Sequence, residues 1–290
     1  MADLFWLASY PKSGNTWIRI LLANYRTDAP ACINALSQYG MSGAFLRSLF
    51  DRYCGLKSST LPAHTAERLQ PDVYRMLAAH APMPLVLKVH DGWKQTDRGE
   101  ALFPSDVTTG TIYVLRNVLD VAPSAADHWG VDCATAVERL CDPHFALASD
   151  PQVLSPGLRQ HLGSWSGHVA SWVDRSGLAP LVVRYEDLVA DTAGALAKIV
   201  ACLGWNVEAQ RIDRAVNNSH FAKLQARERE TGFREASPVS RSSFFRSGRA
   251  GTWREALTPE LTTKLVERHG DMMQRFGYID GRGYPLESVP

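Results

Sequence analysis

The sequence lacks the cysteine patterns of a disulfide-stapled or zinc-binding protein. Its five cysteines are odd in number and contain no CxxC pair (Cys32, Cys54, Cys133, Cys141 and Cys202). Neither a disulfide framework nor a zinc site is therefore expected, and a reducing compartment fits best. The chain also lacks the basic start of a signal peptide and any run of about 18 apolar residues. We expect a cytoplasmic protein without a membrane segment.

An excess of charge of either sign is absent as well. The 290 residues carry 31 basic and 30 acidic side chains, a formal net charge of +1, so a nucleic-acid partner is not expected. Hydrophobic residues make up 45% of the chain, enough to bury a core. No repeat, low-complexity tract or Gly/Ser linker divides it. We therefore expect one domain over residues 1–290.

What is present is an alternation of apolar runs and helical patterns. Four runs are typical of strands buried on both faces, at residues 4–8, 85–89, 111–115 and 181–184. Helical spacing of apolar residues follows at residues 15–25, 193–203 and 259–276. This order predicts an α/β fold with a central parallel sheet flanked by helices, whose ligands bind at the carboxyl ends of the strands.

Two stretches, residues 27–84 and 130–170, are rich in proline and have short apolar clusters. They predict short helices and loops around the ligand pocket.

The segment SYPKSGNTW, residues 9–17, joins the first strand to the first helix. A helix N-terminus presents unpaired N–H groups to an anion, and glycine lets the backbone approach it closely. Lysine adds a point charge, and short polar side chains add donors. The residues are Lys12, Ser13, Gly14, Asn15, Thr16 and Trp17. An ordinary capped turn is the simpler interpretation, but this combination of residues favours a phosphate site. The segment is not a Walker A loop, because the pattern GxxxxGK[ST] is absent.

YPKSGNTW closely resembles the 5′-phosphosulfate loop of the cytosolic-type sulfotransferases. Three further blocks recur in that family's order: YVLRNVLDVAPS at residues 113–124, RYEDL at 184–188, and FFRSGRAGTW at 244–253. The resemblance spans most of the chain. It implies the P-loop-like sulfotransferase fold and the donor 3′-phosphoadenosine 5′-phosphosulfate, with no metal.

The donor carries two separated anionic groups, so its site needs two cradles. The resemblance implies that Arg116 and Ser124 contact the 3′-phosphate, and that a loop closes over it from the other side. The members of that loop are Phe245, Arg246, Ser247 and Gly248. It also implies that the adenine is held by Tyr185, Ser219, Phe221 and Phe244.

The chain departs from the family pattern at three of these positions. Ser247 stands where a lysine is usual, which weakens a phosphate contact or moves it to Arg249. Leu119 stands at a usually basic position. Pro123 removes an N–H within the helix that aims Ser124.

Lys88, Val89 and His90 end the second predicted strand, so the side chains of Lys88 and His90 share one face at the sheet edge. Histidine suits general base work near neutral pH. The resemblance places His90 as the catalytic base, with Lys12 stabilising the leaving phosphate oxygen and Lys88 supporting the transferring group or positioning His90. A lone histidine is more often structural. Asp91 is the reserve candidate for the base.

The expected acceptor is a hydroxyl of a small molecule or natural product. Seven aromatic residues could line its pocket or equally belong to the core: Phe45, Phe50, Tyr53, Trp93, Trp129, Phe145 and Trp165. The sequence around Arg254 and residues 258–259 matches the family's dimer motif only weakly, so it does not predict the oligomeric state. Two alternatives also stay open, a P-loop-type phosphotransferase and a non-catalytic adenine-nucleotide-binding module.

Overall fold

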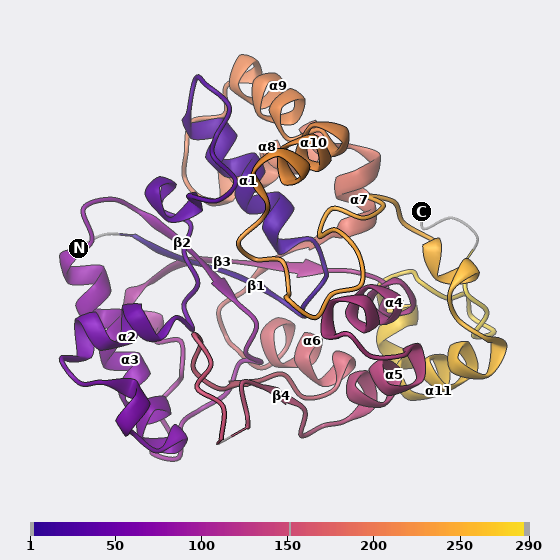
Figure 1. The fold of residues 1–290 in the computed structure, drawn as a ribbon, viewed down its shortest axis with the longest axis horizontal. Coiled ribbons are helices and arrows are strands. Elements are labelled where there is room, and N and C mark those ends of the chain that lie inside the picture. The colour runs from indigo at the N-terminus through magenta and orange to yellow at the C-terminus, as the bar shows by residue number, and fades with distance from the viewer. Residues whose placement is uncertain (1–2, 151, 287–290) are drawn as a thin grey trace.

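A sheet of four parallel strands forms the centre of the computed structural model, which describes residues 3–150 and 152–286 (Figure 1). The strand order is β2-β1-β3-β6. The strands are β1 (Leu4–Ser9), β2 (Leu85–Val89), β3 (Thr108–Leu115) and β6 (Leu181–Arg184). All four predicted strands are confirmed, and β3 begins three residues before the prediction. The predicted α/β class with a parallel sheet is confirmed.

The strand β1 shows why these runs are apolar throughout. Its six residues are all buried, and successive side chains enter opposite layers. Leu4, Trp6 and Ala8 pack into one hydrophobic cluster, while Phe5 and Leu7 pack into another. A strand with helices on both faces is therefore apolar along its length, and in β1 only the last residue, Ser9 at the sheet edge, is polar.

One layer of helices covers the face of Phe5 and Leu7. Its members, in the upper part of Figure 1, are α1 (Asn15–Arg26), α8 (Thr192–Cys202), α9 (Ala209–Asn218) and α10 (Phe221–Thr231). The layer on the other face comprises α3 (Ala63–His80), α4 (Val118–Trp129), α5 (Cys133–Cys141), α6 (Trp165–Val173) and α11 (Pro259–Arg275).

The remaining elements are short. They are α2 (Arg47–Cys54), α7 (Tyr185–Ala190), the two-residue strands β4 (Ala146–Leu147) and β5 (Gln160–His161), and 3-10 turns at Leu36–Tyr39, Ser58–Thr60, Ser105–Val107 and Thr252–Glu255. Within the described ranges, no helix is both long and apolar enough to cross a membrane.

The expectation of only short helices over residues 27–84 is wrong, because α3 runs for 18 residues. Pro71 lies inside it. A proline there costs one backbone hydrogen bond, but burial of a helical stripe compensates. That stripe includes Val73, Tyr74 and Leu77, all at most 3% exposed. Tertiary packing has overridden the local signal of the proline.

Two buried carboxylates hold the loops at the carboxyl edge of the sheet. Glu186 accepts hydrogen bonds from the backbone N–H of Asn117 at 3.0 Å and from the Tyr278 hydroxyl at 3.1 Å. Asp120 accepts from the backbone N–H groups of Gly251 at 2.7 Å and Trp253 at 3.0 Å. These carboxylates therefore fix the turn after β3 and the end of the segment that precedes α11.

Candidate active site

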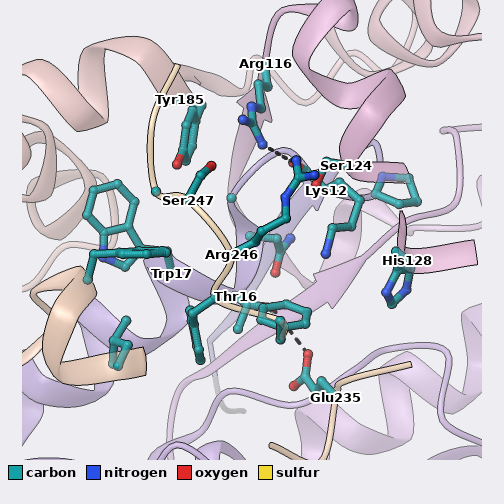
Figure 2. A pocket seen from close by; sticks show the side chains of 18 of the residues that line it. Lys12, Thr16, Trp17, Arg116, Ser124, His128, Tyr185, Glu235, Arg246 and Ser247 are labelled. Atoms are coloured by element: carbon teal, nitrogen blue, oxygen red, sulfur yellow. Dashed lines mark hydrogen bonds between the residues drawn. The ribbon is translucent and has the colours of Figure 1, made fainter. Parts of the chain in front are cut away.

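The site lies where β1, β2 and β3 end, in a cavity of about 460 Å³ (Figure 2). Every residue assigned from the sequence to the donor site or to catalysis lines this cavity, with the exception of Ser13. Ser13 is buried beside it, in the turn that forms one wall. Segments from residue 11 to residue 248 thus converge on one cavity, as the sheet-edge argument predicts.

The turn between β1 and α1 has an unusual backbone. Lys12 adopts φ 71° and Gly14 adopts φ 104°, both in the left-handed region. A Cβ at residue 14 would lie 2.7 Å from Cδ2 of Tyr185, so glycine is required by packing as well as by φ. Gly14 caps α1 without a side-chain hydrogen bond. The first N–H groups of α1 therefore remain available to a ligand.

Asn15 fixes this turn to the strand that precedes it. Its Nδ2 donates to the carbonyl oxygen of Leu7 at 2.8 Å and to Oγ of Ser9 at 3.3 Å. Its Oδ1 accepts from Nε of Arg19 at 3.1 Å. Asn15 lines the cavity, but its side chain is engaged in holding the loop rather than free to reach a ligand.

Two buried polar atoms beside the turn have no hydrogen-bond partner. They are Oγ of Ser13 and Nε of Arg116. A buried donor without a partner is costly, and a ligand with acceptor oxygens would satisfy both. The chemistry of the cavity therefore fits a phosphate-like group.

Arg116 links the turn to the C-terminal loop, which we define as residues 232–251. Its guanidinium donates to the carbonyl oxygens of Lys12 at 3.0 Å and Arg249 at 3.3 Å, and stacks 4.3 Å from the centre of the Tyr185 ring. Figure 2 shows Arg116, Lys12, Ser124 and Arg246 gathered on one side of the cavity. Ser124 reaches it from α4 although Pro123 lies in the same helix.

The C-terminal loop packs on α10 through aromatic residues. Glu228 accepts from the backbone N–H groups of Phe244 at 2.6 Å and Phe245 at 2.9 Å. Gly248 has φ 62°, and a Cβ there would come within 2.4 Å of Cδ2 of Phe221. The ring of Phe244 lies 4.3 Å from Nζ of Lys12. This placement sets Phe244 against the lysine, a contact that the sequence did not indicate.

A second group of side chains forms an aromatic slot in the same cavity, next to Arg116. Trp17 and Tyr185 meet edge to face at 6.0 Å, and Nε1 of Trp17 donates to the carbonyl oxygen of Ser219 at 3.1 Å. Phe221 lines the same cavity. Oγ of Ser219 accepts from Nδ2 of Asn24 at 2.9 Å. The slot offers aromatic faces and a polar edge to a planar ring.

Lys12 belongs to the turn itself, and its surroundings disfavour the charged form of its side chain. Burial, reinforced by the nearby charge of Arg116, lowers the pKa of Lys12 to about 8. An anion bound beside it would reverse this effect. A bound anion would therefore stabilise the charged form of Lys12.

His90 lies 9% exposed at the end of β2. Its Nδ1 is 2.8 Å from the carbonyl oxygen of Ser9, which can only accept, so Nδ1 carries the proton. Nε2 is then the unprotonated nitrogen. Burial, with the charge of Lys88, holds the pKa of His90 well below its usual value. The imidazole stays neutral near pH 7 and can accept a proton.

Asp91 stands apart from this arrangement. It does not line the cavity, and its Oδ1 accepts from the backbone N–H of His161 at 2.8 Å. Burial raises the pKa of the Asp91 carboxyl to about 7. Its position is that of a residue that fixes β5 beside β2.

Two residues beside Lys88 were not identified from the sequence. Arg19 projects from α1 with its side chain 2% exposed, and Glu235 of the C-terminal loop binds both Arg19 and Lys88. A signal did exist, because Glu235 is the one acidic residue in the otherwise basic segment 231–251. Arg19 lies four residues after Asn15 on the buried face of α1, the spacing of a helical pair.

The aromatic residues considered for an acceptor pocket divide between cavity and core. Phe45 and Trp129 line the cavity, together with Leu147, Gln160 and His128. Phe50 and Trp165 are 1% and 0% exposed and belong to the core. The others lie outside the lining: Tyr53 and Phe145 pack against the core, and Trp93 lines a separate surface pocket.

Known proteins that resemble this chain along most of its length include sulfotransferases. Sulfotransferase 2A1 of Rattus norvegicus is 26% identical over 270 residues, which cover 88% of this chain and 79% of the relative. Sulfotransferase 1A1 of Bos taurus is 26% identical over 276 residues, covering 91% and 80%. Among solved structures, mouse sulfotransferase SULT7A1 complexed with PAP aligns with a TM-score of 0.61 at 19% identity, covering 97% of this chain and 86% of that one.

A second solved structure, retinol dehydratase in a complex with retinol and PAP, has a TM-score of 0.60 at 19% identity and covers 94% of this chain and 82% of that one. These two structures show a shared fold. The sequence profile of the sulfotransferase domain matches residues 2–277. The chain belongs to the sulfotransferase family.

Proposed function

We propose that residues 1–290 form one sulfotransferase domain that moves a sulfuryl group from 3′-phosphoadenosine 5′-phosphosulfate to a hydroxyl of a small-molecule acceptor. The observation that carries this proposal is the convergence of three features on one cavity. They are the anion-binding turn, the ammonium of Lys12 and the neutral imidazole of His90. Two of the structural neighbours are complexes with PAP, the desulfated nucleotide, which supports the same donor here.

The residues present fit this donor. The partnerless Oγ of Ser13, the N–H groups at the start of α1, Thr16 and Lys12 would hold the 5′ end. The 3′-phosphate would lie with Arg116, Ser124, Arg246, Ser247 and Gly248, and the adenine with Trp17, Tyr185, Ser219 and Phe221. Phe244, whose ring lies 4.3 Å from Nζ of Lys12, would contact the adenine from the side of the turn, and its neighbour Phe245 would belong to the loop over the 3′-phosphate.

The donor supplies an activated sulfuryl group, and the chain supplies proton transfer and charge. Nε2 of His90 accepts the proton of the acceptor hydroxyl. Lys12 neutralises the negative charge that grows on the departing phosphate oxygen, a stabilisation that is strong in a water-poor cavity. Lys88, on the same face of β2 as His90, contributes a second ammonium toward the transferring group.

The acceptor end of the cavity is mainly apolar. Phe45, Trp129 and Leu147 line it, and Gln160 and His128 add two polar groups. This lining suits a small, largely apolar or aromatic molecule with a hydroxyl. The retinol dehydratase structures contain retinol or androsterone, molecules of that kind.

The first prediction distinguishes this function from a P-loop phosphotransferase and from a binding module. Wild-type protein incubated with 35S-labelled donor and a panel of phenols and alcohols should form labelled products, and excess EDTA should leave the rate unchanged. Liquid chromatography with scintillation counting measures both. Activity with ATP that requires magnesium would support the phosphotransferase, and nucleotide binding without any transfer would support the module.

The second prediction concerns the base. His90→Ala should lower kcat by about two to four orders of magnitude, the usual worth of general base catalysis, while calorimetry shows nearly unchanged affinity for PAP. His64→Ala, at an exposed position of α3, is the matched control. If His90→Ala keeps more than about a tenth of wild-type turnover, His90 is not the base.

The third prediction concerns the 3′-phosphate. Arg116→Ala and Arg246→Ala should each weaken binding of PAP by about 1.5–3 kcal/mol, the value of a charge-assisted hydrogen bond, and weaken adenosine 5′-phosphate far less. Arg229→Ala, exposed on α10, is the control for general charge loss. Equal losses for the two nucleotides would place the arginines away from the 3′-phosphate.

The fourth prediction concerns Lys12. Because the pKa of Lys12 is lowered to about 8, the free enzyme loses this charge as the pH rises through 8, so kcat/KM for the donor should fall there. Lys12→Met should remove that alkaline limb and cut kcat about a hundredfold or more, with only a several-fold loss of donor affinity. A Lys12→Met profile that keeps the limb would assign it to another group.

A further inference from the structure

Glu235 is the one carboxylate among the described residues that line the cavity, and the mechanism above gives it no task. Its Oε2 lies 3.0 Å from Nζ of Lys88 and 2.6 Å from Nη2 of Arg19, and its Oε1 lies 2.8 Å from Nη1 of Arg19. We propose that Glu235 is a positioning residue that keeps Lys88 charged and directed into the cavity. This inference rests on the proposed function, because it assigns Lys88 a charge that the reaction uses.

The need for a counter-ion follows from burial. The side chains of Lys88 and Arg19 are only 14% and 2% exposed. Two cations held together away from water disfavour each other's charge. Burial lowers the pKa of Lys88, and Arg19 lowers it further, whereas the carboxylate of Glu235 opposes both. Arginine stays protonated, so without Glu235 the proton leaves from Lys88.

Glu235 itself is reliably ionised. Burial alone would raise the pKa of its carboxyl, but the charges of Lys88 and Arg19 and their hydrogen bonds hold it well below the usual range. The carboxylate is therefore a permanent negative charge near neutral pH. It comes from the C-terminal loop, so the loop that would cover the 3′-phosphate also sets the charge at the reacting end.

The hydrogen bond to Glu235 orients the ammonium of Lys88 and leaves its other N–H donors available. An ammonium has three donors, and one of them reaches Oε2 of Glu235. Nζ also lies 5.7 Å from the centre of the Phe45 ring, which packs beside it at the cavity wall. The ammonium is thus held between a carboxylate and a ring face, with donors left for an anionic group in the cavity.

Other titratable groups face Lys88 from each neighbouring element. Arg19 lies on α1, His90 directly after β2, Lys12 on the turn and His128 on α4. The charge of Lys88 lowers the pKa of Lys12, His90 and His128. His90 and His128 are already neutral near pH 7, since burial dominates both shifts. A change in the alkaline pH range therefore reports on Lys88 and Lys12.

A simpler role is that Glu235 only anchors the loop on Arg19. Arg19 also donates to Asn15 at 3.1 Å and to Oγ1 of Thr16 at 3.0 Å, so a loss of Glu235 could disturb the turn without involving Lys88. That role predicts lower stability and weaker nucleotide binding at every pH. It predicts no change in the ionisation of Lys88.

The test therefore measures ionisation directly. The protein is labelled with [13C]lysine at Cε, and the resonance that disappears in Lys88→Gln is assigned to Lys88. In Glu235→Gln its pKa should fall by about one pH unit or more, in Glu235→Asp it should stay near the wild-type value, and in Glu230→Gln, an exposed carboxylate of α10, it should not move. An unchanged pKa in Glu235→Gln overturns the proposal, whether or not the protein transfers sulfate.

Turnover gives the second measurement. Glu235→Gln should lose up to about tenfold in kcat/KM for the donor at alkaline pH and recover as the pH falls, because at pH values above both pKa values a pKa lowered by one unit leaves about a tenth of the wild-type charge on Lys88. In a Lys88→Gln background the same change should cost less than about twofold, and melting temperature and PAP affinity check that the turn survives. If the losses of the two single variants multiply in the double variant, or if Glu235→Gln gains activity, Glu235 does not act through Lys88. Failure of the wild type to use the donor would reject the proposed function alone.

Discussion

The structure depends on burying several positive charges together at the carboxyl edge of one sheet. Lys12, Arg19, Lys88 and Arg116 all lie there with little exposure to water. Burial of like charges is costly, so the surroundings must supply carbonyl oxygens, ring faces and a carboxylate. The backbone of the turn, the ring of Tyr185 and the C-terminal loop meet most of these demands, and Oγ of Ser13 and Nε of Arg116 are left without a hydrogen-bond partner.

The same constraint explains why distant segments converge. Parallel strands place all of their carboxyl ends at one edge, so residues 12, 88 and 116 become neighbours although about a hundred positions separate the first from the last. The buried carboxylates Glu186 and Asp120 then fix the loops by accepting backbone N–H groups, which helices and strands leave unpaired at their ends. Because the loops are anchored in this way, their charged side chains are held in fixed orientations toward the cavity.

Much of this could be predicted from the sequence, because strands buried on both faces leave continuous apolar runs and the turn between β1 and α1 has a local pattern. The four strands and the cavity-lining motifs were found in this way. The helix α3 was missed because Pro71 is a local signal against it, whereas its stability comes from packing along a buried stripe. Phe50 and Trp165 could not be separated from Phe45 and Trp129, since aromatic residues look alike in a sequence whether they face a cavity or a core.

The partners of Glu235 and the tautomer of His90 could not be predicted from the sequence, for a different reason. A salt bridge between residues 19 and 235 has no periodicity, and the protonated nitrogen of His90 follows only from the carbonyl oxygen of Ser9 beside it. Both depend on where the backbone places single polar atoms. In this protein the sequence motifs identify which side chains reach the cavity. The buried residues that contact those side chains set their protonation states. The proton on His90 is placed by the carbonyl oxygen of Ser9, and the charge of Lys88 is opposed by burial and favoured by Glu235.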